Sequence, residues 1–98
     1  MYLAKVIGNV VATQKSPELE GAKLLFIQPY VNRDGKLEPA GNSIVAVDSV
    51  GAGVGELVLC TQGSAARLTP ATKGAPADSV IVGIVDCVEV EGKSVYRP

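Results

Sequence analysis

The sequence predicts an all-β fold, and within that class a small OB-like β-barrel of about five strands with at most one short helical turn. Val and Ile together outnumber Leu in this 98-residue chain, and β-branched residues favour strands over helices. Short apolar runs also alternate with turn-forming segments along the whole chain. Glycines interrupt two of the longest runs, as expected where a sheet bends sharply enough to close into a barrel.

The first strand is expected over residues 2–13, where Ala4 and Val6 share one face and Lys5 lies on the other. Gly8 falls in mid-strand and predicts a bulge or sharp bend. A second strand, residues 23–31, is apolar on both faces. The dipeptide Asp34-Gly35 after it predicts a tight reversal, because it supplies the positive φ angles that such a turn requires.

A third strand is expected over residues 43–50 and a fourth over 56–62, joined as a hairpin by the glycine-rich segment between them. Residues 63–79 contain glycines, prolines and small polar residues, which allow one helical turn near 65–68 and little more. A long strand over 80–90 and a short final piece at 94–97 complete the pattern. We expect residues 1–98 to form a single domain, because no linker or repeat divides them.

Composition excludes several classes of function. The chain has no histidine, so Ser-His-Asp or Cys-His nucleophiles, histidine bases and histidine metal ligands are all impossible. The net charge of −1 predicts no strong attraction to nucleic acid or to an anionic membrane. The N-terminal segment lacks the features of a signal peptide or a membrane span.

Cys60 and Cys87 lie far apart, within apolar runs, and neither has a neighbouring Cys at metal-ligand or redox-motif spacing. We therefore expect buried, reduced thiols in a cytosolic protein. We also expect no metal, nucleotide or redox cofactor. No pair of carboxylates shows a catalytic arrangement in the sequence, so no enzymatic activity is predicted.

The glycine-rich segment Gly51-Ala52-Gly53-Val54-Gly55-Glu56 has three interpretations. It departs from the dinucleotide-binding fingerprint, because Glu56 replaces the third glycine and a β-branched run follows instead of a helix. It is also no phosphate-binding P-loop, since no Gly-Lys-Ser or Gly-Lys-Thr occurs. Two interpretations remain open: the segment is a hairpin turn with positive φ angles, or its backbone packs closely against a neighbouring subunit.

Arg67 follows Gly63, Ser64 and two alanines, a run of small residues that permits close approach of another surface. Its guanidinium could form paired hydrogen bonds with a carboxylate, and Glu56, Asp48 and Asp78 are candidate partners. A solvated surface arginine is the alternative.

Three segments, read in order, resemble the EutN/CcmL family of bacterial microcompartment vertex proteins: MYLAKVIGNVVATQKSPELEGAKLLFIQP, VAVDSVGAGVGELVLCTQGSAAR and ADSVIVGIVDCVEV. The resemblance spans nearly the whole chain and implies an OB-like barrel. It also implies a non-catalytic homopentamer that caps the five-fold vertices of a polyhedral shell in the bacterial cytoplasm, beside hexameric shell proteins. Neither nucleic acid nor membrane is an implied partner.

Carried onto this sequence, the resemblance makes nine residues candidates for subunit contacts or for a central pore: Gly51, Ala52, Gly53, Gly55, Glu56, Gly63, Ser64, Ala65 and Arg67. The alternative function is a monomeric OB-type module that binds single-stranded nucleic acid or oligosaccharide. That alternative is disfavoured by the small number of aromatic residues and the absence of a cationic excess.

Overall fold

The computed structural model describes residues 1–13, 17, 21–62 and 79–97. Eight strands are present in this part of the chain: β1 (Tyr2–Val10), β2 (Lys23–Arg33), β3 (Lys36–Pro39), β4 (Ile44–Asp48), β5 (Leu57–Gln62), β6 (Ser79–Ile84), β7 (Val88–Val90) and β8 (Lys93–Tyr96). The helical turn predicted near residues 65–68 lies outside the described residues.

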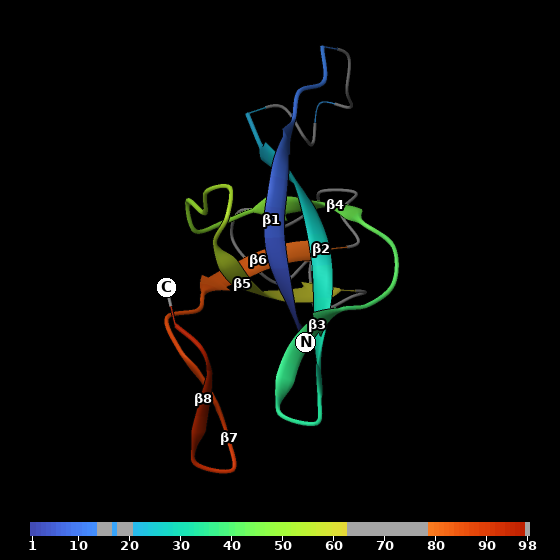
Figure 1. Cartoon of the computed structure of the whole chain (residues 1–98). Coiled ribbons are helices and arrows are strands. Elements are labelled where there is room, and N and C mark those ends of the chain that lie inside the picture. The colour runs from blue at the N-terminus through green and yellow to red at the C-terminus, as the bar shows by residue number, and fades with distance from the viewer. Residues whose placement is uncertain (14–16, 18–20, 63–78, 98) are drawn as a thin grey trace.

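Five strands close into a barrel in the order β1-β5-β6-β4-β2, and β2 pairs again with β1. All pairs are antiparallel except β4 with β6, which are parallel. β3 extends β2 as a hairpin beyond the barrel, and β7 pairs with β8 as a separate two-stranded sheet. Figure 1 shows the barrel strands crossing one another, with both hairpins extending from the same end. The predicted all-β, OB-like barrel is confirmed.

The barrel interior is filled by side chains of one parity on each strand. Ala4 and Val6 on β1 alternate with exposed Lys5, as the sequence pattern predicts. The buried cluster inside the barrel is Ala4, Val6, Leu25, Ile27, Ala46, Ala52, Val58, Cys60 and Ile81. A five-stranded barrel is narrow, and these medium and small side chains fit its interior.

β2 is apolar on both faces because each face has its own apolar neighbours. Leu25 and Ile27 point into the barrel, whereas Leu24 packs against Val47 and Val80 on the outer face. This second cluster lies where parallel strands β4 and β6 meet, with Val47 opposite Val80.

Two local predictions are confirmed at particular residues. The register between β1 and β2 shifts between Val6 and Gly8, which is the predicted bulge. Asp34 and Gly35 have φ angles of 51° and 82°, and they join Arg33 to Lys36 by a two-residue turn. A second turn of the same kind at Glu91 and Gly92, with φ angles of 52° and 79°, joins β7 to β8.

The predicted hairpin over residues 43–62 is wrong. β4 and β5 do not pair; β6 lies between them and bonds to both. The glycine-rich segment still reverses the chain, because β4 is parallel to β6 and β5 is antiparallel to it, but the segment carries the chain past β6 instead of forming a tight turn. The register needed for this arrangement comes from residues more than 30 positions away in the sequence, such as Ile81 opposite Asp48.

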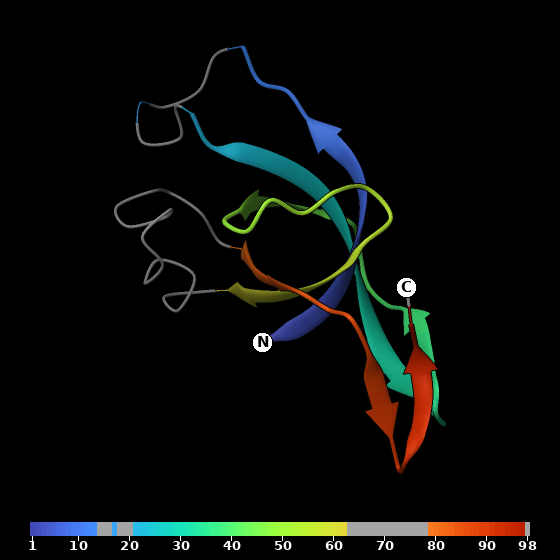
Figure 2. The same ribbon diagram turned by 90° about the vertical axis from the view of Figure 1, so that its left-hand side faces the viewer.

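The single strand predicted over 80–90 is also wrong. β6 ends at Ile84, and β7 begins at Val88. The amide of Val85 still donates to the carbonyl oxygen of Leu57, the first residue of β5 (2.9 Å). Beyond this bond β5 offers no further partner, so the chain leaves the barrel and pairs with itself as β7 and β8 (Figure 2).

Candidate functional site

The glycine loop, residues 49–56, joins β4 to β5 and is tied to the barrel at both ends. At its start, the amide and hydroxyl of Ser49 both donate to the carbonyl oxygen of Ile81, at 3.3 and 2.6 Å. At its end, the amide of Gly55 donates to the carbonyl oxygen of Val6 (2.8 Å). The amide of Val6 in turn donates to the carbonyl oxygen of Glu56 (3.0 Å). The loop is therefore anchored to both β6 and β1.

Asp48 organises the first half of this loop. One carboxylate oxygen accepts the amides of Val50 (3.0 Å) and Gly51 (3.2 Å), and the other accepts the amide of Ala52 (2.9 Å). The side chain is only 1% exposed. Lys23 lies 3.6 Å from the second oxygen and also donates to the carbonyl oxygen of Ala52 (2.7 Å). The carboxylate thus accepts hydrogen bonds from three backbone amides that have no other partner within the loop.

Glu56 organises the second half. Its carboxylate accepts the amide of Gly53 (2.6 Å), while its own amide donates to the carbonyl oxygen of Gly53 (3.2 Å). Gly51 and Gly55 have φ angles of 80° and 93°, in the left-handed region. A residue with a side chain is strained there, so these two positions require glycine for backbone reasons.

The same scaffold separates the loop's side chains into a buried and an exposed set. Ala52 is 0% exposed and belongs to the barrel core, so its side chain packs within its own chain. Val50 and Val54 are instead 39% and 58% exposed. A loop braced by the carboxylates of Asp48 and Glu56 therefore presents two apolar side chains to the surroundings.

The structure brings five of the nine predicted site residues together, since Gly51, Ala52, Gly53, Gly55 and Glu56 all lie in this loop. Gly63, Ser64, Ala65 and Arg67 lie outside the described residues, as does Asp78. The other two candidate partners of Arg67, Asp48 and Glu56, both accept hydrogen bonds from loop amides.

Sequence reasoning missed that Asp48 holds the loop and that the valines are its exposed members. An Asp directly before a glycine-rich segment is a signal that could have indicated the first, because Asp side chains often accept amides two or more residues ahead.

We expect Gly55→Ala to lower the free energy of unfolding by about 1–2 kcal/mol, because alanine is strained at the φ angle of Gly55. Gly53→Ala is the matched control. Gly53 does not have a positive φ angle, and a Cβ there would meet Glu56 Oε1 at 3.4 Å, a contact that a small side-chain shift relieves. Urea unfolding followed by circular dichroism compares the two variants, and equal costs would contradict the assigned loop geometry.

The two cysteines differ in environment. Cys60 is fully buried beside its cross-strand partner Tyr2, whose hydroxyl donates to Ser79 Oγ (3.0 Å). Cys87 is free and exposed, in the segment between β6 and β7. The expectation that both thiols are buried in apolar strands is therefore wrong for Cys87, because the chain has already left the barrel at that point.

Burial raises the pKa of the Cys60 thiol from 9.0 to about 11, and hydrogen bonding with Tyr2 only partly opposes this rise. The unfolded chain loses this proton near pH 9 and the folded chain only near pH 11. Stability is therefore expected to be constant below pH 9 and to fall by on the order of 2 kcal/mol between pH 9 and 11. Burial raises the pKa of Tyr2 as well, which acts in the same direction.

Urea midpoints measured from pH 7 to 11 test this dependence. Cys60→Ala should flatten the decline relative to its own value at pH 7, leaving the smaller contribution of Tyr2. An unchanged decline in Cys60→Ala would show that another group is responsible.

Among the described residues, no group of three or more Cys, Asp or Glu side chains is placed to hold a metal ion. The same residues include no helix that is long and apolar enough to cross a membrane. The features that the structure does supply are a closed barrel and a braced loop with exposed valines. They define the class of the protein as a small OB-like barrel.

Comparison with known proteins identifies the family. The family model described as ethanolamine utilisation protein EutN/carboxysome matches residues 1–86. The chain is 53% identical over 88 residues to the bacterial microcompartment shell vertex protein PduN of Salmonella typhimurium, covering 88% of this chain and 96% of the relative. It is 47% identical over 97 residues to the carboxysome shell vertex protein CcmL of Synechocystis, covering 99% of this chain and 94% of the relative. The chain belongs to the EutN/CcmL family.

Solved structures agree with this assignment. A carboxysome subunit CcmL superposes with a TM-score of 0.89 at 46% identity, covering 99% of this chain and 98% of that one. The pentameric microcompartment shell protein GrpN from Rhodospirillum rubrum superposes with a TM-score of 0.80 at 47% identity, covering 92% of this chain and 99% of that one. The predicted family resemblance is confirmed.

Proposed function

We propose that this chain is a structural vertex protein of a bacterial microcompartment shell, where it forms a closed ring of five copies and acts without catalysis. One observation carries the proposal: the chain is 53% identical to a shell vertex protein, and the match covers 96% of the length of that protein. The likeness to a pentameric shell protein supports the ring. These relatives favour a vertex function over the nucleic-acid or oligosaccharide module.

A five-fold ring requires head-to-tail contacts between two different patches of each subunit. The glycine loop suits one of these patches, because it is rigid and exposes Val50 and Val54. We propose subunit contacts around Gly51, Ala52, Gly53, Gly55 and Glu56, and we propose Gly63, Ser64, Ala65 and Arg67 as further contact residues. Ala52 contributes through its backbone, since its side chain is buried in its own barrel.

The ring would close a shell built mainly from hexameric, hexagonally tiling proteins in the bacterial cytoplasm, with residues 1–98 acting as one domain. A sheet of hexagons stays flat or rolls into a tube, and five-fold units supply the corners of a closed polyhedron. A net charge of −1 per chain adds little repulsion between subunits or against neighbouring tiles. Edge contacts of modest area suffice, because each ring docks against several neighbours at once.

Deleting the gene in its native host and imaging the compartments tests this function. Elongated, open or leaky shells that retain the hexameric component are expected. Normally closed shells, in a host with no second vertex protein, would contradict the proposal.

A further inference from the structure

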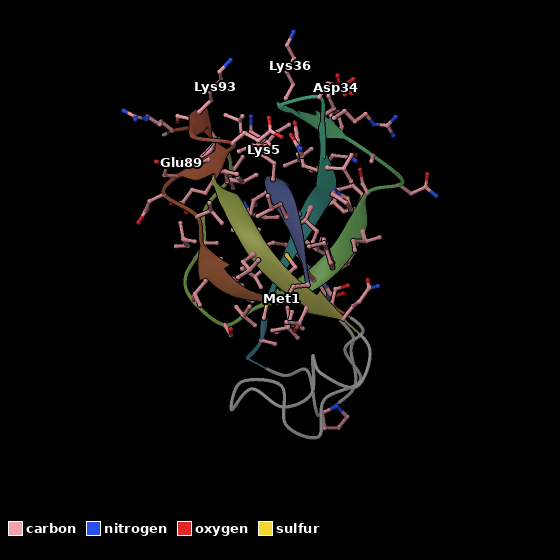
Figure 3. All side chains as sticks on the ribbon, turned by 90° about the horizontal axis from the view of Figure 1, so that it is seen from below. Met1, Lys5, Asp34, Lys36, Glu89 and Lys93 are labelled. Carbon is pink, nitrogen blue, oxygen red and sulfur yellow. The ribbon has the colours of Figure 1, made fainter. Side chains whose placement is uncertain are left out.

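One end of the barrel carries two hairpins whose turns have similar sequences. The β2–β3 turn reads Asp34-Gly35-Lys36, and the β7–β8 turn reads Glu91-Gly92-Lys93. Figures 1 and 2 show both hairpins extending in the same direction from the barrel, and β3 is in contact with β8. Figure 3 shows Asp34 and Lys36 on one hairpin, and Glu89 and Lys93 on the other, gathered on one side of the molecule.

A cleft of about 470 Å³ lies between these hairpins, and we call it the hairpin cleft. One wall is the β2–β3 tip, with Asn32 and Asp34. The other wall is one face of the β7–β8 hairpin, where Val90 pairs with Lys93 and Val95 follows two residues later. Glu91 at the turn completes the lining. The cleft therefore combines an apolar strip of two valines with two carboxylates that come from different hairpins.

Charge selects the occupant. Asp34 and Glu91 contribute two negative charges against the single positive charge of Lys93, so the lining is net negative. Among the residues that the structure describes, the ion pairs are Lys23 with Asp48 and Arg33 with Glu38, and neither involves the cleft. Figure 3 shows the Lys93 side chain pointing outward, away from the ribbon. Its ammonium group is thus directed away from the cleft (Figure 3).

We propose that the hairpin cleft binds the arginine or lysine side chain of a partner protein. The aliphatic part of such a side chain can lie along Val90 and Val95, while its cationic head reaches the carboxylates of Asp34 and Glu91. Arginine fits better than lysine, because its planar guanidinium can donate to two carboxylates at once. The proposal depends on the cleft of a single chain, so it stands or falls independently of the five-membered ring.

A short model peptide, acetyl-Gly-Arg-Gly-amide, is the probe for this site. Titrated into the isotopically labelled full-length protein, it should shift the NMR amide signals of Gly35, Gly92 and Val95 in a saturable way, with Kd on the order of 1 mM. The matched peptides with Gln or Glu in place of Arg should leave these signals in place. Equal shifts with all three peptides, or no shift with the Arg peptide at 20-fold the expected Kd (about 20 mM), would overturn the proposal.

Variants distinguish binding in the cleft from general electrostatic attraction between the protein and the peptide. Asp34→Asn and Glu91→Gln should each weaken binding of the Arg peptide about five- to tenfold. Glu89→Gln is the matched control, since Glu89 alternates with Val90 on β7 and is not part of the lining. It removes the same charge and should change Kd less than twofold. Equal weakening by Glu89→Gln and Glu91→Gln would contradict a specific site.

Lys93→Gln provides a test of opposite sign. Removing the only positive charge of the lining should tighten binding of the Arg peptide about two- to fivefold, because the cationic head then meets no like charge. Weaker binding in Lys93→Gln would show that the occupant is held by Lys93, and the assignment of a basic side chain would be wrong. Circular dichroism establishes in each case that the exposed substitutions leave the barrel folded.

Discussion

Replacing Asp48 with alanine is expected to lower the free energy of unfolding by about 3–5 kcal/mol, a large part of the stability of a domain this small. The variant leaves the amides of Val50, Gly51 and Ala52 without their acceptor at the barrel end. It also removes the carboxylate that lies 3.6 Å from the ammonium group of Lys23. The amide of Ala52 is the least exposed of the three donors, so the loss of its acceptor contributes most to the cost.

Asp48→Asn is expected to lower the free energy of unfolding by a smaller amount than Asp48→Ala. Its single side-chain oxygen can keep the amides of Val50 and Gly51 but loses the acceptor for Ala52, so about 2 kcal/mol is expected. Glu38→Ala serves as the control, because Glu38 pairs with Arg33 at 3.7 Å on the surface and should contribute less than about 0.5 kcal/mol. Urea unfolding of the three variants measures these differences. A cost below about 1 kcal/mol for Asp48→Ala would show that the loop does not depend on this carboxylate.

Val54→Asp is expected to weaken assembly of the ring at least about 100-fold while leaving the barrel folded. Val54 is the most exposed apolar side chain of the glycine loop, and a carboxylate there would have to enter an apolar contact without a partner. The stability of the single chain should change by less than about 0.5 kcal/mol, because the side chain contacts little in its own barrel.

Val45→Asp is the matched control for assembly, since Val45 is similarly exposed but lies on the outer face of β4. Sedimentation velocity over a range of protein concentrations measures the assembly of both variants. A Val54→Asp protein that assembles as tightly as the unmodified chain would remove the glycine loop from the proposed subunit contact.

Features with a local cause could be predicted from the sequence. The mid-strand glycine at position 8 marks the bulge, and Asp34-Gly35 marks the turn, because each depends on a few adjacent φ angles. The alternation of Ala4, Lys5 and Val6 likewise fixes which face of β1 is buried.

Features set by long-range pairing could not be predicted in this way. Nothing near residues 49–56 indicates that β6 inserts between β4 and β5, since that arrangement depends on Val47 meeting Val80. The break after Ile84 arises because β5 begins at Leu57, a limit set in another part of the chain.

The glycine-rich loop is recognisable in the sequence, but the positions of its side chains are not. Ala52 is an ordinary small residue in the sequence, and only the closed barrel shows that its side chain fills the core. The sequence offers Asp48 as a candidate partner of Arg67, and the structure shows that its carboxylate accepts three loop amides. The conformation of this glycine-rich segment therefore depends on where the fold places the acidic residues at its two ends.

Native mass spectrometry of the unmodified protein tests the central claim most directly. The account predicts a single assembly of five copies of the 10.1 kDa chain, close to 50 kDa, at concentrations of roughly tens of micromolar. A monomer near 10 kDa under the same conditions, or an assembly with a different number of copies, would contradict the proposal that this chain forms the five-fold vertex of a shell.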